Sequence, residues 1–453
     1  MSIGRDEAMN IAGRATSVRR RVGIVIAAVA FVLSGCATEH ALMPTPTIYT
    51  GANALPLFGD SPGGSQRPVL DLLYVTDRAP AERDGDLPYT AERSHSIAFG
   101  STMIEFGQNL SWKELLEQGT APQTPKRLNV ALGATTELGH FPAIPYEVVV
   151  DSDGIMRVPN VVEAYAGAKA RLQAEIARRL ALVRRKEVVL FVRGYHTNFE
   201  SAALTMGELC HFLGREFVCG IFSWPAGSQR GVLFGYGVDR ESAEYAVEDL
   251  VKTIRIVGRT PGVERVHLIA HSRGTDTLAT ALSQLSAEAY MLRSSPEREF
   301  HIANVVLVAP DLDGDVAISK IFKVFSDPDL PFGERAAPSA LLPPAPNLRV
   351  TVYVSPDDKA IAAAGWLFGG LARLGRMDAG MLAPEQIKAI GQLRAVNIIQ
   401  VRGTTDLFGH DYFVSNPGVS GDMIAMLRYG LRPGESSRPL EQIEGPFWRV
   451  STP

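Results

Sequence analysis

The stretch 265-RVHLIAHSRGTDTLATAL-282 decides the fold, because it joins a short apolar segment to a helical pattern through one serine. Val266, Leu268, Ile269 and Ala270 predict a buried strand, and leucines at 278, 282 and 285 share one helix face. Ser272 falls at the corner, with Ala270 two residues before it and Gly274 two residues after it. Small residues at these positions permit a tight turn that holds the hydroxyl at the start of a helix, where backbone N–H groups favour negative charge.

Strand and helix patterns alternate along the rest of the chain. Short apolar segments bounded by loops predict further strands at 69–76, 188–192, 217–223, 305–308, 350–354 and 397–401. Amphipathic patterns predict helices at 198–213, 240–258, 275–290, 358–374 and 418–430. Apolar strands between such helices are typical of an α/β fold with a mostly parallel sheet covered on both faces. The region 80–150 is harder to interpret and has room for extra strands.

Composition and charge exclude several classes of function. The 453 residues are 46% hydrophobic and 21% charged, with a net charge of −4 and no basic stripe, which argues against nucleic acid as a partner. The chain has no G-x-G-x-x-G motif and no P-loop, so nothing supports a nucleotide cofactor. It also lacks C-x-x-C and H-E-x-x-H, so nothing supports a metal site. We therefore expect no cofactor.

The N-terminus predicts an export signal. Arginines at 19–21 precede an apolar run over 22–33, which is short for a membrane span. The run ends in Leu33-Ser34-Gly35-Cys36, which resembles the lipobox of bacterial lipoproteins, in which the cysteine is lipidated. Ala37 after the cysteine implies, by the same resemblance, sorting to the outer membrane, facing the periplasm. A plain cleaved signal or a short anchor is the alternative.

These signals divide the chain into four parts. We predict a lipoprotein signal peptide at 1–36, a flexible tether at 37–67, an α/β domain at 68–433 and a C-terminal tail at 434–453. The tether is rich in Pro, Gly, Ser and Thr. Residues 326–347 contain six prolines between two predicted strands and read as a surface excursion.

A serine at a strand-to-helix corner is the nucleophile elbow of α/β-hydrolases, where the chain order is Ser, then an acid, then His. A serine hydroxyl needs a base to become nucleophilic at neutral pH. Only His301 and His410 follow the helix after Ser272, and only His410 lies on a loop directly after a predicted strand. We therefore predict His410 as the base. His271 is the less favoured alternative, because its side chain leaves the turn in another direction.

The acid that orients the base should follow the strand before the last one. The loop 353-YVSPDDKAI-361 offers Asp358 and Asp357. Asp311 and Asp313, after the preceding strand, are further alternatives. We favour Asp358 and leave the others open, with turn or helix-cap roles for those not used.

Two backbone N–H groups should stabilise the oxyanion. One belongs to the residue after the serine, Arg273, and the other to the loop after an earlier strand. The segment 189-VLFVRGYHTNF-199 supplies that loop. Gly194 lets the backbone approach the reacting carbonyl, and the Tyr195 N–H is the expected donor.

Several motifs in one order resemble an uncharacterised bacterial family of α/β-hydrolases with a domain of unknown function. They are FVRGYHTNF, FSWPAGS, DRESA, IAHSRGT, YVSPDDKA, Arg373-Leu374-Gly375 and GHDYF, spread over about 69–430. The family pattern S-x-x-D-x-A-L falls on 355–361, which favours Asp358 over Asp357. Arg193 replaces the family's usual His, and His196 stands where Asn is common. The resemblance implies the fold and the chemistry, while the family has no settled substrate.

Other residues carry less specific signals. Trp224 fits pocket lining and packing under a turn equally well, and Asp239-Arg240 favours a structural ion pair at a helix start over a ligand site. Cys210 and Cys219 could form a disulfide in an exported protein, but their spacing does not fix the distance between them.

The sequence thus predicts a membrane-tethered serine hydrolase that cleaves a carboxylic ester or acyl lipid. An acyltransferase, a thioesterase or a peptidase would use the same triad. A catalytically silent envelope lipoprotein with the same fold is a further alternative. The sequence makes no prediction of oligomeric state.

Overall fold

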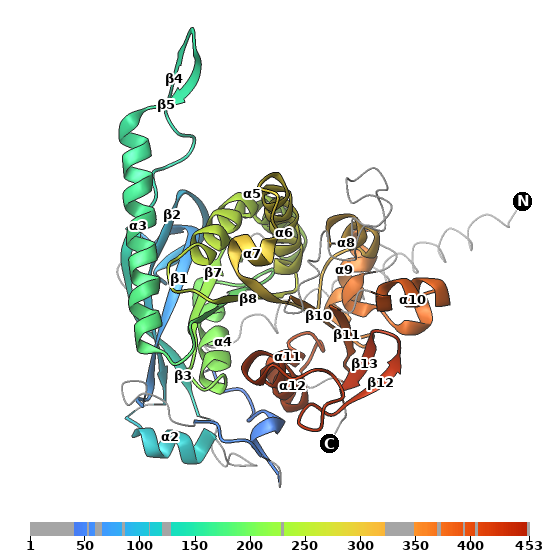
Figure 1. Cartoon of the computed structure of the whole chain (residues 1–453). Helices are drawn as coiled ribbons and strands as arrows, with labels where there is room; N and C mark the ends of the chain where they lie inside the picture. Colours follow the sequence, from blue (N-terminus) through green and yellow to red (C-terminus); the bar gives the residue numbers. More distant parts are fainter. Residues whose placement is uncertain are drawn as a thin grey trace, which may run out of the picture. The chain divides into compact units, whose positions relative to one another are not determined.

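The computed structural model describes residues 40–51, 54–58, 66–83, 87–107, 109–119, 128–227, 231–321, 348–368, 373–392, 395–403 and 406–450. Within them, eleven strands form one sheet in the order β12-β13-β11-β10-β9-β8-β6-β7-β1-β2-β3 (Figure 1). These strands are β1 (Val69–Pro80), β2 (Tyr89–Phe106), β3 (Val130–His140), β6 (Glu187–Val192), β7 (Val218–Ser223), β8 (Arg265–His271), β9 (Ile302–Val308), β10 (Arg349–Val354), β11 (Val396–Gln400), β12 (Leu440–Glu444) and β13 (Phe447–Val450).

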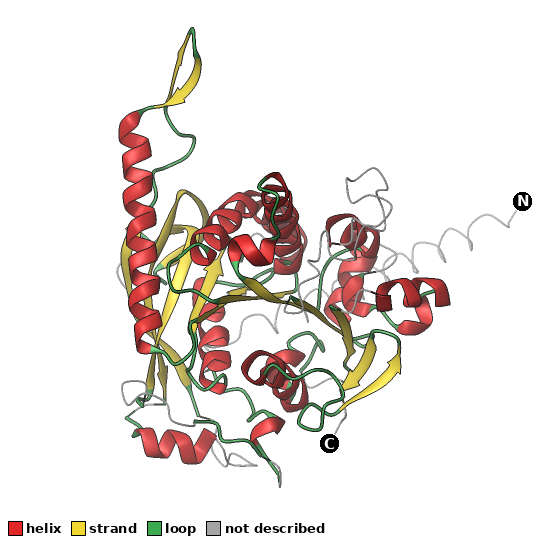
Figure 2. Cartoon of the chain, in the orientation of Figure 1, coloured by secondary structure: helices red, strands yellow, loops and turns green. Residues whose placement is uncertain are grey.

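Helices lie on both sides of this sheet (Figure 2). They are α2 (Trp112–Gly119), α3 (Pro159–Leu182), α4 (Phe199–Phe212), α5 (Gly231–Gly258), α6 (Gly274–Met291), α7 (Pro296–Phe300), α8 (Gly314–Ile321), α9 (Lys359–Phe368), α10 (Pro384–Gln392), α11 (Tyr412–Ser415) and α12 (Pro417–Tyr429). Short 3-10 turns lie at Thr47–Tyr49, Leu374–Arg376 and Ala379–Met381, and a separate hairpin pairs β4 (Val148–Asp151) with β5 (Gly154–Arg157).

The central strands are parallel, from β1 through β7, β6, β8, β9, β10 and β11 to β13. Antiparallel pairs occur at the two edges of this sheet, where β2 and β3 extend it beyond β1 and β12 extends it beyond β13. Because β7 and β8 lie on opposite sides of β6, the strand order reverses at β6. Loops at the carboxyl ends of strands diverge at such a switch point, where α/β proteins bind their ligands.

Each face of the sheet carries its own apolar core. Val188, Leu190 and Val192 of β6 pack with α3, α5 and α6, whereas Val189 and Phe191 pack with α4 and α12 on the other face. All six residues of β6 are buried. Burial on both faces explains why these strands read as continuous apolar runs, and it confirms the predicted α/β sheet covered on two sides.

Most predicted elements occur within a few residues of their predicted bounds, with three larger differences. The helix predicted at 358–374 corresponds to α9, which ends at Phe368, and Arg373 forms a bridge with Asp313 instead of a helical turn. The region 80–150 contains the 18-residue strand β2 and its partner β3, which form an antiparallel extension of the sheet. Helix α5 begins at Gly231 rather than at 240, so Asp239 lies inside the helix and not at its start.

The N-terminal part of the predicted tether does not behave as a flexible linker. Met43, Tyr49 and Leu57 are buried against the domain. The Met43 N–H donates to Glu208, and the Tyr49 hydroxyl donates to the Phe212 carbonyl at 2.5 Å. The expectation of a tether over 37–67 is therefore wrong for residues 40–51 and 54–58. Large apolar side chains in this Pro-rich stretch pack into the core of the domain.

The predicted C-terminal tail at 434–453 is also corrected, since it contributes two strands to the sheet. Strand β13 pairs in parallel with β11, and β12 pairs with β13. Phe447 is fully buried, and Leu440 and Val450 are each 9% exposed. Strand β11 is therefore not the last strand and not an edge of the sheet.

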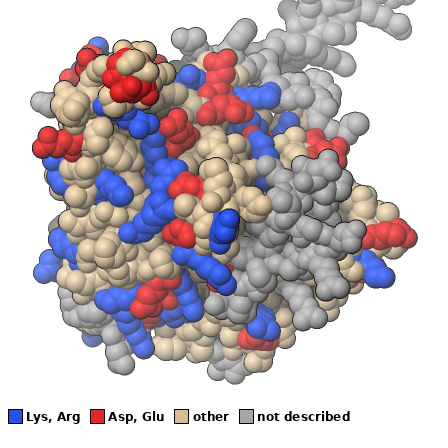
Figure 3. All heavy atoms as spheres, turned by 45° about the horizontal axis from the view of Figure 1, so that its top comes forward, with Lys and Arg blue, Asp and Glu red and all other residues tan. Residues whose placement is uncertain are grey.

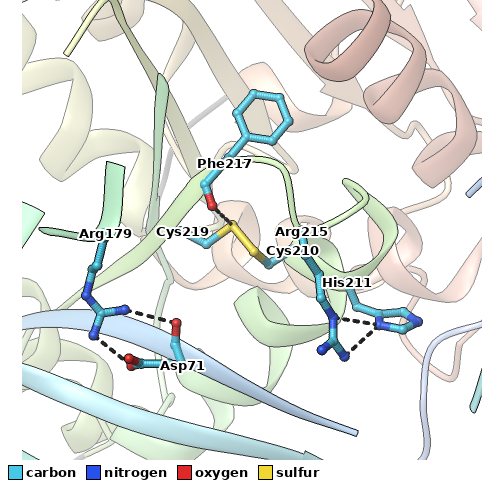
Figure 4. Close-up of a disulfide and its surroundings, with 7 residues drawn as sticks. All are labelled: Asp71, Arg179, Cys210, His211, Arg215, Phe217 and Cys219. Carbon is cyan, nitrogen blue, oxygen red and sulfur yellow. Dashed lines mark hydrogen bonds and ion pairs between the residues drawn. A yellow bond between two sulfur atoms is a disulfide. The ribbon is translucent and has the colours of Figure 1, made fainter. Parts of the chain in front are cut away.

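Cys210 of α4 and Cys219 of β7 form a disulfide, with their Cα atoms 6.1 Å apart (Figure 4). Beside it, Arg215 donates to Nδ1 of the buried His211. Arg179 of α3 pairs with Asp71 of β1 at 2.7 Å. The pairing left open by the sequence is formed because α4 packs directly on β7.

Some predicted features lie outside the described residues, namely the signal peptide 1–36 with Cys36 and the excursion 326–347. In the part of the chain that the structure describes, no helix has both the length and the apolar character needed to cross a membrane. Although no basic stripe is apparent in the sequence, Lys and Arg side chains gather on one face of the folded chain, with Asp and Glu side chains along the margins of this group (Figure 3).

Candidate active site

Ser272 lies at the corner between β8 and α6, as predicted. Its φ of 53° is in the left-handed region, which is strained for a residue other than glycine. The Ser272 N–H donates to the Val308 carbonyl of β9 at 3.0 Å, and its carbonyl accepts from the N–H and hydroxyl of Thr275. These bonds hold the turn, so the side chain projects from the carboxyl edge of the sheet.

Two glycines let neighbouring backbone approach this corner. A Cβ on Gly194 would lie 2.6 Å from Ser272 Cβ and 2.9 Å from the Arg273 nitrogen. A Cβ on Gly274 would lie 2.6 Å from the carbonyl oxygens of Val192 and Arg193. All of these distances are shorter than a real Cβ tolerates, so the loop after β6 touches the serine turn only because these residues are glycine.

His410 and Asp358 are brought together from two loops. His410 Nδ1 is 2.7 Å from Asp358 Oδ2, and the Asp358 side chain is fully buried. Asp358 follows β10, and His410 follows β11, which is the neighbouring parallel strand. The adjacency of these strands at their carboxyl ends explains why residues 52 positions apart form this contact.

The His410 ring lies beside the serine turn. Its centroid is 4.6 Å from that of His271, the residue before Ser272, and the His410 carbonyl is 3.2 Å from His271 Nε2. Because Nδ1 faces Asp358, Nε2 is the nitrogen available for proton transfer. The structure contains no hydrogen bond between the described side chains of Ser272 and His410. Such bonds commonly tighten only in the substrate complex.

The alternative acids have other partners. Asp311 accepts from the Tyr236 hydroxyl at 2.9 Å and pairs with Arg373 at 3.0 Å. Asp357 accepts from the Gly403 N–H, and Asp313 accepts from N–H groups in the first turn of α8. His301 ends α7 and contacts the Gly258 carbonyl. None of these side chains has a described hydrogen bond to His410.

The pKa values of the two neighbouring histidines, His271 and His410, are shifted in opposite directions. Burial, reinforced by the charge of His410, holds the pKa of His271 well below its usual range, which makes it a neutral packing group against Phe413. Burial alone would also lower the pKa of His410. The hydrogen bond and charge of Asp358 outweigh this effect, so the pKa of His410 lies above its ordinary value. An acid that favours the imidazolium is what a general base requires.

The predicted oxyanion donors lie on the two segments that touch at Gly194. Arg273 is the N-cap residue of α6, and no side chain caps that helix. The Arg273 guanidinium pairs with Asp276 at 2.9 Å. Arg273 would therefore contribute its backbone N–H, and not its side chain, to an oxyanion site. Tyr195 follows Gly194 directly. The indole of Trp224, 2% exposed, donates to the Arg193 carbonyl, which makes this tryptophan a packed support for the loop.

Two supports of the His410 loop were not predicted. Arg193 pairs with Asp411 at 2.9 Å and donates to the Thr205 hydroxyl at 2.7 Å. Asp406 accepts from the His410 N–H at 3.1 Å. The departure of Arg193 from the family's usual His was visible in the sequence, but its partner lies 218 positions later and only the fold reveals it.

A serine at a strained strand-to-helix turn, with an Asp–His pair on later loops of the same parallel sheet, defines the class of α/β-hydrolase fold proteins. The model of the family described as alpha/beta hydrolase of unknown function (DUF900) matches residues 168–428. The chain belongs to this family, which confirms the resemblance found in the sequence. Among curated proteins, none matches the chain significantly in sequence.

The solved structures that match this chain share little sequence with it. A predicted CIB-like hydrolase from Thermoplasma acidophilum is 15% identical, covers 54% of this chain and 87% of its own, and has a TM-score of 0.29. Esterase B from Lactobacillus rhamnosis, in a structure with a tributyrin phosphonate inhibitor, is 11% identical over 47% and 79%, with a TM-score of 0.24. A structure titled ESTFA, an Fe-lacking apo form, is 15% identical over 54% and 75%, also with a TM-score of 0.24. Similarity this low carries no information about substrate.

Proposed function

We propose that this protein is a serine hydrolase that cleaves carboxylic esters, with Ser272, His410 and Asp358 as its triad. The observation that carries the proposal is the 2.7 Å bond between Asp358 and His410, formed beside the strained turn that presents Ser272. The three groups come from loops after three different strands. Packing or turn formation alone would not require a buried carboxylate on an imidazole at this place.

The proposed reaction follows from these positions. Ser272 Oγ attacks the acyl carbon while His410 Nε2 takes its proton, and Asp358 stabilises the imidazolium. The N–H groups of Arg273 and Tyr195 bind the oxyanion. His410 then gives the proton to the leaving alkoxide as the C–O bond breaks. Water attacks the acyl-enzyme, His410 takes the water proton, and Ser272 recovers its hydrogen as the acid is released.

An ester with an apolar part suits the surroundings of His410. Leu407 and Phe408, directly before Gly409 and His410, are 70% and 57% exposed. Large apolar side chains exposed at a reaction centre favour contact with an acyl or alkyl chain. This supports an ester or acyl-lipid substrate over a strongly charged one.

We also propose that the protein is a lipoprotein anchored through Cys36 in the cell envelope, at the outer membrane facing the periplasm. The buried Cys210–Cys219 disulfide supports export, because disulfides persist mainly in oxidising compartments. Changing Cys36 to Ser should move the protein from the membrane fraction to the soluble fraction. Unchanged partitioning would remove the lipid anchor from the proposal.

A fluorophosphonate probe tests the catalytic proposal directly. The wild type should be labelled, and a folded Ser272→Ala variant should not. A His410→Gln variant should lose about 10²–10⁴-fold in turnover of a short-chain aryl ester, whereas His271→Gln should lose far less. An unlabelled wild type with native circular dichroism would instead support a silent member of the fold.

A further inference from the structure

Two buried charged residues outside the proposed triad hold the loops beside Ser272. Arg78 extends from β1 and is 2% exposed, and Asp239 extends from α5 and is 1% exposed. Each contacts the same two loops at the carboxyl edge of the sheet. We call these the β6 loop, residues 194–198, and the β7 loop, residues 224–227.

The contacts of the two residues are complementary. One Asp239 oxygen accepts from the N–H groups of His196 and Gly227, both at 3.0 Å. The Arg78 guanidinium donates to the carbonyls of Thr197 at 2.6 Å and Ala226 at 2.9 Å. Asp239 therefore binds one N–H from each loop, and Arg78 binds one carbonyl from each loop.

The β6 loop needs such support because its backbone is strained. His196 has a φ of 55°, a conformation that is strained for a residue other than glycine and persists only where neighbouring groups enforce it. Its N–H belongs to the peptide unit directly after Tyr195. Asp239 fixes the peptide unit that follows Tyr195, and the contact of Gly194 with the Ser272 turn fixes the residue that precedes it. Together these two contacts set the position of the Tyr195 N–H relative to Ser272.

A purely structural role would not call for this arrangement. Buried charges are costly to desolvate, and apolar side chains often stabilise a fold equally well. Burial lowers the pKa of Arg78 to about 10, opposed by the charges of Asp77 and Asp239, so the guanidinium stays charged at neutral pH. Two oppositely charged side chains that make four hydrogen bonds to the backbone of these two loops fix the geometry of the loops rather than adding general stability.

We propose that Asp239 and Arg78 are positioning residues that fix the β6 loop, and with it the Tyr195 N–H, for oxyanion binding. This inference rests on the proposed serine-hydrolase function. We propose no direct contact between either residue and the reacting atoms. Their effect is expected on kcat, because an oxyanion donor acts in the transition state and not in the ground state.

The test compares variants at two buried aspartates of the same helix. Asp239→Ala removes the acceptor of both loop N–H groups, and Asp239→Asn keeps an oxygen at that place. Asp249→Ala is the matched control, since Asp249 is 3% exposed and pairs with Lys252. We expect Asp239→Ala to lower kcat on an aryl acetate by about 10²-fold with KM within about threefold. Asp239→Asn should recover most of kcat, and Asp249→Ala should keep it.

A second measurement keeps the inference testable without turnover. Amide hydrogen exchange in peptides covering 194–199 and 222–227 should accelerate in Asp239→Ala and not in Asp249→Ala. Wild-type kcat in a folded Asp239→Ala variant, or equal exchange in both variants, would overturn the positioning role. A wild type that neither labels nor turns over would refute the proposed function, and the exchange data would still decide whether Asp239 holds the loop.

Discussion

Ser272 occupies its strained conformation because its immediate neighbours are small and its backbone bonds to β9 and to the first turn of α6. Ala270 and Gly274 revealed this from the sequence alone, since a tight strand-to-helix turn requires small residues at those positions. The acid partner of the proposed base, His410, was harder to predict. Asp357 and Asp358 are adjacent in sequence, so their position alone does not separate them. The family pattern favoured Asp358, and the folded loop directs the Asp358 carboxylate to His410 and that of Asp357 to the Gly403 N–H.

The charge state of His410 leads to a prediction about pH. The imidazole must be neutral to act as a base, and Asp358 raises its pKa above the ordinary value. We therefore expect kcat/KM to fall as the pH drops through an apparent pKa above about 6.5. In Asp358→Asn the burial remains while the stabilising charge is lost. The inflection should then move to lower pH, and kcat should fall by about 10³–10⁴-fold.

Asp357→Asn is the control for this experiment, because its carboxylate binds the Gly403 N–H rather than His410. Its pH–rate profile should match that of the wild type. A pH–rate profile that shifts in Asp357→Asn and not in Asp358→Asn would show that Asp357, and not Asp358, is the acid.

At the scale of elements, the sequence predicted the alternation of strands and helices better than their bounds. The residues before 240 include Gly231, Gly235 and Gly237, which have low helix propensity. They nevertheless belong to α5, where Tyr236 binds Asp311 and Asp239 binds the two loops. Tertiary contacts therefore extend the helix beyond the point that local preference indicates.

The disulfide between α4 and β7 permits a prediction at this scale. It closes a loop with a sequence separation of 9 and lies near the amino end of β7, whereas Ser272 follows the carboxyl end of β8. Replacing both cysteines with Ala should lower the free energy of unfolding by about 2–3 kcal/mol and leave kcat unchanged. Denaturant unfolding with and without reductant measures this, and the reduced wild type should resemble the variant. Equal stability with and without the bond would contradict the expectation.

At the scale of the whole molecule, both ends of the described chain belong to the domain. Tyr49 packs near α4, and the last strands extend the sheet beyond β11. The sequence suggested a tether and a tail there, because prolines, glycines and polar residues outnumber apolar residues in both segments. A few large side chains are enough for docking when a core surface is available.

Phe447 tests the role of the C-terminal strands. It is fully buried at the junction of β13 and β11, so Phe447→Ala should lower the free energy of unfolding by about 3–5 kcal/mol. Arg449→Ala is the control, since that side chain is 39% exposed and its change should stay within about 0.5 kcal/mol. Urea unfolding measures both. A free tail, in contrast, would make the two variants equally stable.

The sequence by itself determined the parallel α/β sheet, the serine turn, and the loop that carries His410. These features depend on side chains within a few positions of one another, so their spacing is sufficient evidence. Only the tertiary structure decided that Asp358 binds His410, that Arg193 binds Asp411, that the two cysteines pair, and that both ends pack on the domain. Each of these contacts joins groups that different elements deliver, and their distances are set by how those elements pack.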